Sequence, residues 1–181
     1  SHVTMPMRDE TVSTGFILGL LGYAIARGAD RDALLTQAGI DAATLNDRDA
    51  RLPFARYVAL MHAAKSLTGD DALALNFGQA VDVSDISVIW LIGLAANTML
   101  EAFEQLNRYV RLIVDVELVG EDRFALRRDA QGLWFTDLRA DPNTFPELTE
   151  SAFSHIIAGP RRAGIPEWIK EVRVTHARPA H

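Results

Sequence analysis

Apolar residues recur at intervals of three and four along the N-terminal part of the chain, the spacing of an amphipathic helix. The first such stretch covers residues 10–27. A second, shorter one lies between Asp30 and Gly39, residues of the types that begin and end helices. The N-terminal part is therefore predicted to be helical.

Residues 49–115 carry the clearest helix signals. Pro53 stands near a helix start, where its missing N–H costs nothing, and Gly69 is placed to end that helix. Thr98 and Glu101 form a capping box, in which the hydroxyl and the carboxylate each satisfy a free N–H group. The helix that they open is predicted to reach about residue 113, with Asn107 at the edge of its inward face. That face consists of Leu100, Phe103, Leu106 and Val110.

From Val114 onward the pattern changes to the two-residue alternation of strands. Short strands around residues 116–118, 124–126 and 133–135 are separated by turn residues, which predicts an antiparallel meander. A helix over residues 147–158, ended by Gly159 and Pro160, and a fourth strand over 170–176 are also expected.

The predicted fold class is α+β, with N-terminal helices packed on a small, mainly antiparallel sheet that the C-terminal meander forms. The length of 181 residues favours one domain, expected over residues 3–181.

Charge and composition exclude several classes of protein. The chain has 24 acidic and 18 basic side chains, a net charge of −6, whereas phosphate-binding proteins show a basic face. No nucleic-acid binding is therefore expected for this chain itself. Cysteine is absent, which rules out disulfides and thiolate metal sites. No apolar run approaches the roughly 20 residues of a membrane span. Neither a metal nor a cofactor is expected, and the expected location is cytoplasmic.

One helix face could carry hydrolytic chemistry. Ser151 and His155 are four residues apart, and Glu147 lies one turn before Ser151, a weak likeness to a nucleophile, base and orienting carboxylate. Side chains so close along one helix rarely leave an oxyanion hole beside them. Ordinary helix packing is therefore favoured, and a small hydrolase that uses Ser151 and His155 is the alternative.

Aromatic residues occur where the helices are expected to meet the sheet. Core packing is the simpler interpretation of each one, but as a group they are suited to line a small-molecule cavity with a few polar side chains. Such a pocket is expected between residues 86–96, the helix that Thr98 opens and the meander. The candidate ligand-binding residues are Trp90, Asn97, Phe103, Asn107, Arg108, Trp134 and Phe135.

Four segments, in order and at similar spacing, resemble the N-terminal effector domain of AraC-type bacterial transcription regulators. The subgroup is the one labelled arabinose-binding, which includes ornithine-utilisation-type regulators. Residues 34–41, LLTQAGID, resemble its "LL…AGLD" pattern, and residues 51–53, RLP, its "ARIP" helix entry. Residues 67–70, LTGD, resemble "LTGDP", with Asp71 in place of the proline. Residues 98–109 resemble "TLxEAxxxLxRY". The likeness covers residues 14–176.

This resemblance implies a non-enzymatic domain that senses a small-molecule effector, forms a homodimer, or does both. It also implies that DNA is bound through a separate C-terminal helix-turn-helix domain, which is expected to be absent from this chain. A dimerisation module without a ligand is a second alternative. The segment around Trp90 departs from the small residues frequent in the family, so that tryptophan is expected to reshape or fill the pocket.

Overall fold

The structure is a computed structural model that describes residues 9–81, 98–162 and 169–177. Its fold class is α+β, as predicted. The helices are α1 (Thr14–Ala26), α2 (Arg31–Ala38), the 3-10 helix η1 (Ala42–Asn46), α3 (Phe54–Thr68), α4 (Leu73–Ala80), α6 (Met99–Ile113) and α7 (Glu147–Arg162). The strands are β1 (Thr11–Ser13), β2 (Arg51–Pro53), β3 (Val114–Asp115), β4 (Phe124–Asp129) and β5 (Gly132–Asp137).

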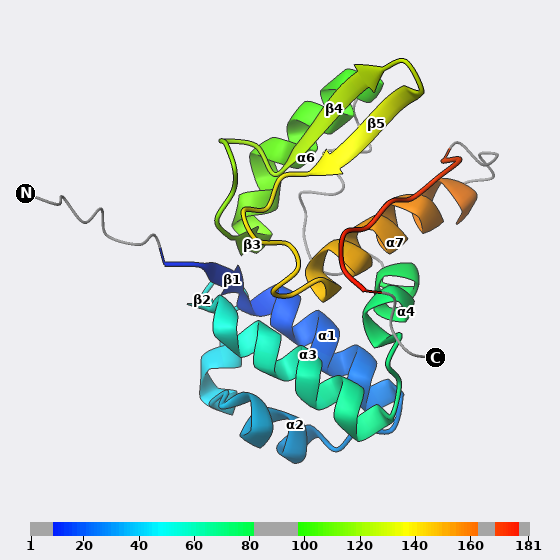
Figure 1. The fold of residues 1–181 in the computed structure, drawn as a ribbon. Coiled ribbons are helices and arrows are strands. Elements are labelled where there is room, and N and C mark those ends of the chain that lie inside the picture. The colour runs from blue at the N-terminus through cyan, green and yellow to red at the C-terminus, as the bar shows by residue number, and fades with distance from the viewer. Residues whose placement is uncertain (1–8, 82–97, 163–168, 178–181) are drawn as a thin grey trace, which may run out of the picture.

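Helices α1, α2 and α3 lie together at one end of the molecule, and the hairpin of β4 and β5 lies beside α6 at the opposite end (Figure 1). Between the two ends, α4 and α7 pack on each other. The main apolar core belongs to the N-terminal helices and α4. Its largest fully buried apolar side chains include Ile17, Leu20, Leu34, Tyr57, Leu60, Met61, Leu73 and Phe77. The hairpin therefore depends on contacts other than this core for its position.

Local capping signals set several helix boundaries. The Asp30 carboxylate accepts the N–H at the third position beyond it at 2.9 Å, and Gly39 ends α2 with a left-handed φ of 65°. Gly69 ends α3 in the same way with a φ of 68°. The Thr98 hydroxyl accepts the N–H of Glu101 at 3.1 Å, and α6 then runs to residue 113. The predicted helix ends at Asp30, Gly39, Gly69 and Thr98 are confirmed, because each signal acts within its own helical turn. The Glu101 half of the capping box stays a prediction.

Strand pairing differs in part from the predicted meander. The hairpin is confirmed, with Phe124 opposite Asp137 and Asp129 opposite Gly132. The predicted strand over residues 116–118 does not extend this hairpin, and it forms a single bridge between Leu118 and Arg139. The preceding strand β3 pairs instead with β1, in a three-stranded antiparallel sheet of order β2-β1-β3. Alternation predicts which face of a strand is apolar, but it does not identify the neighbouring strand.

Two predictions for the C-terminal part are wrong. Helix α7 continues through Gly159 and Pro160 to Arg162, because proline adopts helical φ and its missing N–H removes only one bond near the helix end. Residues 170–176 do not form a strand, and Val172 and Val174 remain about half exposed. Residues 170–176 pair with no strand among the described residues, so their alternating pattern gives no ladder.

Helices α4 and α7 cross very closely at Gly78. A Cβ atom added there would lie 2.2 Å from the backbone carbonyl oxygen of Ser151. The Ser154 hydroxyl also donates to the Leu75 carbonyl oxygen at 2.7 Å, across the same contact. The absence of a side chain at residue 78 therefore sets how near α7 can come to α4.

We expect Gly78→Ala to lower the free energy of unfolding by about 1–3 kcal/mol, because a backbone carbonyl cannot move aside as a flexible side chain can. Gly22→Ala is the matched control, since its added Cβ meets nothing within 4 Å on α1. That change should raise stability by roughly 0.5–1 kcal/mol. Urea denaturation of both variants measures the difference. A Gly78→Ala variant that is as stable as the wild type, or more stable, would contradict the close crossing.

Candidate functional site

Five of the seven predicted ligand-binding residues fall in the described part of the chain. Helix α6 carries Phe103, Asn107 and Arg108, and strand β5 carries Trp134 and Phe135. Trp90, Asn97 and the predicted pocket segment 86–96 lie outside the described residues. The structure thus places two neighbouring elements of the expected site and leaves the third segment unassigned.

Phe135 is the centre of an aromatic cluster that joins three elements. Its ring stacks on Phe124 of β4 at 4.9 Å between centroids and meets Phe103 of α6 edge-on at 5.7 Å. Phe153 of α7 meets the same ring edge-on at 6.0 Å. Phe124 is buried, whereas the other three rings are half-buried. The predicted proximity of Phe103 and Phe135 is confirmed, and Phe153 was missed because α7 is distant in sequence from both.

Trp134 faces away from this aromatic cluster, as strand alternation predicts. The Arg173 guanidinium lies over its ring at 4.5 Å from the centroid. Arg173 also donates to the Gln131 side-chain oxygen at 3.2 Å and pairs with Glu171 at 2.6 Å. Residues from the C-terminal segment 169–177 therefore cover the tryptophan side of the hairpin.

The polar atoms of Asn107 and Arg108 make contacts away from the rings of the aromatic cluster. The Asn107 amide nitrogen donates to the Phe124 carbonyl oxygen at 2.9 Å, and the Phe124 N–H donates to the Asn107 side-chain oxygen at 2.9 Å. This buried pair of bonds fixes the start of β4 on α6. Arg108 is exposed, with its guanidinium 5.5 Å from the centre of the Tyr109 ring.

A buried ionic network lies where the hairpin meets α7. Arg123 donates through Nε and Nη2 to the two oxygens of Asp137, at 2.9 and 3.0 Å, and both side chains are 3% exposed. Thr149 of α7 donates to Asp137 Oδ2 at 2.7 Å. Arg139 donates to Thr149 at 3.2 Å and to the Phe145 carbonyl oxygen at 2.8 Å. We call these five residues the junction network.

Electrostatics within the junction network follow from burial. Burial lowers the pKa of Arg139, and the nearby positive charge of Arg123 lowers it further. The negative charge of Asp137 acts in the opposite direction. A single buried carboxylate therefore serves two buried guanidinium groups, with the backbone carbonyl of Phe145 as a further acceptor for Arg139.

Two buried oxygen atoms beside the junction network have no hydrogen-bond partner among the described residues: the hydroxyl of Tyr57 and Oε2 of Glu147. Tyr57 is completely buried on α3, and Glu147 begins α7. The other Glu147 oxygen, Oε1, pairs with Lys65 Nζ at 3.2 Å. Burial raises the pKa of the Tyr57 hydroxyl strongly, the charge of Arg123 lowers it and that of Glu147 raises it. The hydroxyl thus lies within electrostatic range of both charges.

The Ser151, His155 and Glu147 side chains have different partners. The Ser151 hydroxyl donates to the Leu148 carbonyl oxygen at 3.1 Å within the same helix. His155 Nδ1 lies 3.3 Å from the Gly78 carbonyl oxygen on α4. These contacts, with the Glu147–Lys65 pair, support helix packing as the role of this face.

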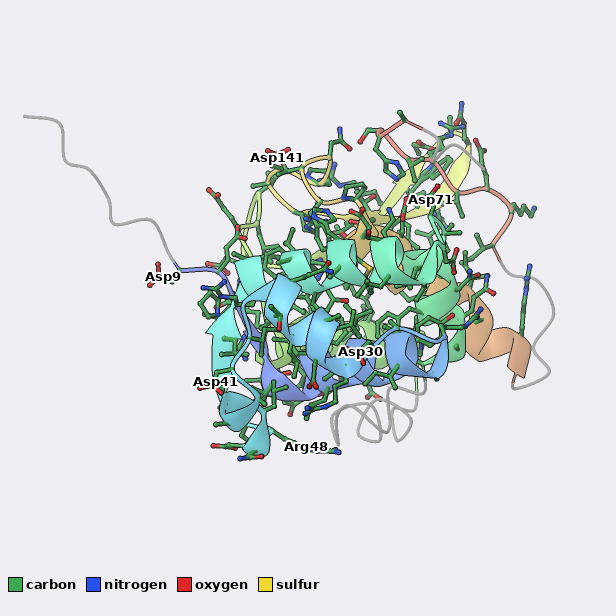
Figure 2. The ribbon with its side chains drawn as sticks, turned by 90° about the horizontal axis from the view of Figure 1, so that it is seen from below. Asp9, Asp30, Asp41, Arg48, Asp71 and Asp141 are labelled. Carbon is green, nitrogen blue, oxygen red and sulfur yellow. The ribbon has the colours of Figure 1, made fainter. Side chains whose placement is uncertain are left out.

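Charged groups elsewhere are dispersed over the surface. Asp9, Asp41, Arg48 and Asp141 lie at the outer edge of the molecule in Figure 2, and each is exposed. Within the described residues, no group of three or more histidine, aspartate or glutamate side chains is placed to hold a metal ion. None of the helices in those same ranges is long and apolar enough to cross a membrane.

The raised pKa of Tyr57 predicts a loss of stability in alkali. The unfolded phenol ionises near its ordinary pKa of 10.0, while the folded one keeps its proton. Stability is therefore fully present below that pH, and above it the free energy of unfolding falls by up to about 1.4 kcal/mol per pH unit.

Urea denaturation at several values between about pH 8 and 11 measures how steeply the free energy of unfolding falls with pH. Tyr57→Phe should make that fall less steep, because it removes the buried hydroxyl. Tyr23→Phe is the matched control, because Tyr23 is only partly buried and its hydroxyl accepts a bond from Arg27. Identical alkaline slopes for wild type and Tyr57→Phe would refute the prediction.

Comparison with known proteins agrees with the sequence resemblance. Residues 28–181 match the family model described as the arabinose-binding domain of AraC transcription regulators, N-terminal. The chain is also similar to the ornithine utilization regulator of Pseudomonas aeruginosa, with 27% identity over 127 residues. That alignment covers 68% of this chain and 38% of the regulator, so the chain spans well under half the length of this relative. The chain belongs to the family of N-terminal, arabinose-binding-type domains of AraC transcription regulators.

Proposed function

We propose that this chain is the effector-sensing part of an AraC-type transcription regulator, and that it forms one domain over residues 3–181. The observation that carries the proposal is the family match over residues 28–181, which includes α3, α6, the hairpin and α7. The ornithine utilization regulator supports a regulatory role, since it bears that description and extends well beyond the matched region. DNA would be bound by a separate C-terminal domain of the whole protein.

The proposed effector site is the aromatic cluster around Phe135, with Phe103 from α6. Three of its four rings are half-buried, so they offer apolar surface that a small molecule can cover. Trp134 lies on the other face of the same strand. Effector binding would change its fluorescence through its contact with Arg173. Trp90 and Asn97 stay predicted members of this site, whereas Asn107 and Arg108 have roles in holding β4 and on the α6 surface.

Transmission would follow the contacts of the hairpin. An effector that binds at Phe135 touches α6, β4 and α7 together, because these elements supply the rings around it. Binding shifts an equilibrium only by its differential affinity for two arrangements of those elements. The junction network links the hairpin to α7, and α7 packs on α4. A change in hairpin position would therefore move α7 and, through α4, the N-terminal helices.

Dimerisation without an effector is the second candidate function. Leu100 and Leu112 on α6 are 59% and 56% exposed, a large apolar exposure for one helix. Exposed apolar surface of this kind is typical of protein contacts when it forms a patch. An effector response and a constitutive dimer are separate outcomes, so one set of measurements distinguishes the two functions.

We expect a metabolite screen to find a compound that changes the tryptophan fluorescence of the chain, with the change reduced in Trp134→Phe. Phe135→Leu should weaken binding by about tenfold, since it removes the central ring of the site. Val119→Ala is the control, because the Val119 side chain is 74% exposed. A dimer in sedimentation that forms without any compound, and no fluorescence response, would favour the dimerisation module.

We also expect this chain alone to show no sequence-specific binding to duplex DNA. Its net charge of −6 repels phosphates rather than neutralising them. A mobility-shift assay at physiological salt, repeated at low salt to reveal non-specific binding, is the measurement. Sub-micromolar binding that depends on the DNA sequence would overturn the assignment of DNA recognition to another domain.

A further inference from the structure

We propose that Glu147 and Tyr57 form a subsite for the ammonium group of a ligand, which displaces Lys65 from Glu147. The inference rests on the proposed sensing function for its biological role, and it gives the effector a chemical class. That class is a small molecule with a primary amine. The subsite lies beside the junction network, at the start of α7, where none of the predicted ligand-binding residues is found.

The first observation is an incompletely paired buried carboxylate. The Glu147 side chain is 9% exposed, and its Oε1 pairs with Lys65 Nζ at 3.2 Å. Oε2 is buried and has no hydrogen-bond partner among the described residues. An ionised carboxylate only accepts hydrogen bonds, and it is costly to bury with an oxygen unsatisfied. The position of Glu147 in the first turn of α7 favours its negative charge. An N–H or O–H donor is therefore missing at Oε2.

The second observation is the unpartnered hydroxyl of Tyr57. Its ring is fixed by stacking on Phe16 at 4.8 Å and by an edge contact with Phe145 at 6.1 Å, so the hydroxyl cannot turn to solvent. Phe145 is two residues before Glu147, and the charge of Glu147 acts on the phenol. A phenol kept neutral by burial offers a lone pair as well as a proton. Each of the two unpartnered oxygens can thus accept a hydrogen bond.

Lys65 shows which chemistry this position accepts. It is an ammonium already bound to the buried carboxylate, and its side chain is 23% exposed, so it has a route to solvent. A ligand ammonium added beside Lys65 would place a second positive charge beside the one carboxylate that Lys65 already neutralises. Exchange of one ammonium for the other keeps the charge constant. The ligand and Lys65 therefore compete.

An anionic ligand suits the same region less well. Arg123 already donates through two of its nitrogens to Asp137, and Arg139 donates to a carbonyl and a hydroxyl oxygen. The atoms that lack partners are a carboxylate oxygen and a phenol oxygen, and the carboxylate repels anions.

The test uses the 181-residue chain and n-butylammonium chloride as the probe, with binding followed by calorimetry and by the melting temperature. Lys65→Met should lower the Kd by about tenfold by removing the competitor, and Glu147→Gln should raise it by about tenfold or abolish binding. Glu150→Gln is the matched control, since Glu150 lies one turn further along α7 and pairs with His176 at 3.5 Å. Pentanoate and 1-butanol, matched in chain length, should not bind.

Equal Kd values for wild type and Glu147→Gln, no binding to Lys65→Met, or equal binding of 1-butanol would each overturn the proposal and leave a buried water as the occupant. Should Glu147→Gln fail to fold by circular dichroism, Lys65→Met with Tyr57→Phe decides the matter, because it should bind n-butylammonium several-fold more weakly than Lys65→Met alone. Failure of the subsite is distinct from failure of sensing. A metabolite without an amine that still perturbs Trp134 would refute only the subsite.

Discussion

The position of the hairpin depends on the buried ion pair between Arg123 and Asp137. Each partner is 3% exposed, so each has lost its hydration, and such a pair is tolerated only when its remaining hydrogen-bonding capacity is used. Here both Asp137 oxygens accept from Arg123, and they also accept from the Arg139 N–H and the Thr149 hydroxyl. Since Thr149 belongs to α7, the hairpin cannot move from that helix without exposing a charged group to an apolar interior. The bonds to Thr149 therefore hold the base of the hairpin, with its ion pair, against α7.

The same helix connects the hairpin to the N-terminal core. Helix α7 meets α4 at Gly78, where the backbones are as near as they can be, and it meets α3 through the Glu147–Lys65 pair. The first contact is steric and the second is electrostatic. The crossing at Gly78 is steric and rigid, whereas Lys65 is partly exposed and can be exchanged for another cation. A ligand at Glu147 would therefore act on a polar, partly exposed connection and not on the steric crossing at Gly78, which is a suitable property for a sensor.

The sequence predicts the structure well where the relevant interaction is local. Asp30, Gly39 and Thr98 satisfy backbone groups within one helical turn, and the hairpin joins strands that are close in the chain, so their residue types suffice for prediction. It fails where a partner is remote. The pairing of β1 with both β2 and β3 brings residue 11 beside residues 53 and 115, and periodicity carries no information on that choice.

The candidate site divides along the same line. Phe103 and Phe135 were expected together because each lies on the apolar face of an element, and faces are readable from spacing. Asn107 was expected to face a ligand, but its two amide atoms bond the backbone of Phe124, a use of the side chain that depends on the docking of β4. Arg123 and Asp137 are charged residues at strand ends, a pattern typical of exposed turns, and only the register of β4 with β5 buries them together. The polar atoms that lack a partner after such docking, Tyr57 Oη and Glu147 Oε2, are a property of the assembled junction. Ligand chemistry is therefore best inferred from those atoms, because an apolar face favours many small molecules, whereas an unsatisfied buried acceptor selects those that supply a donor.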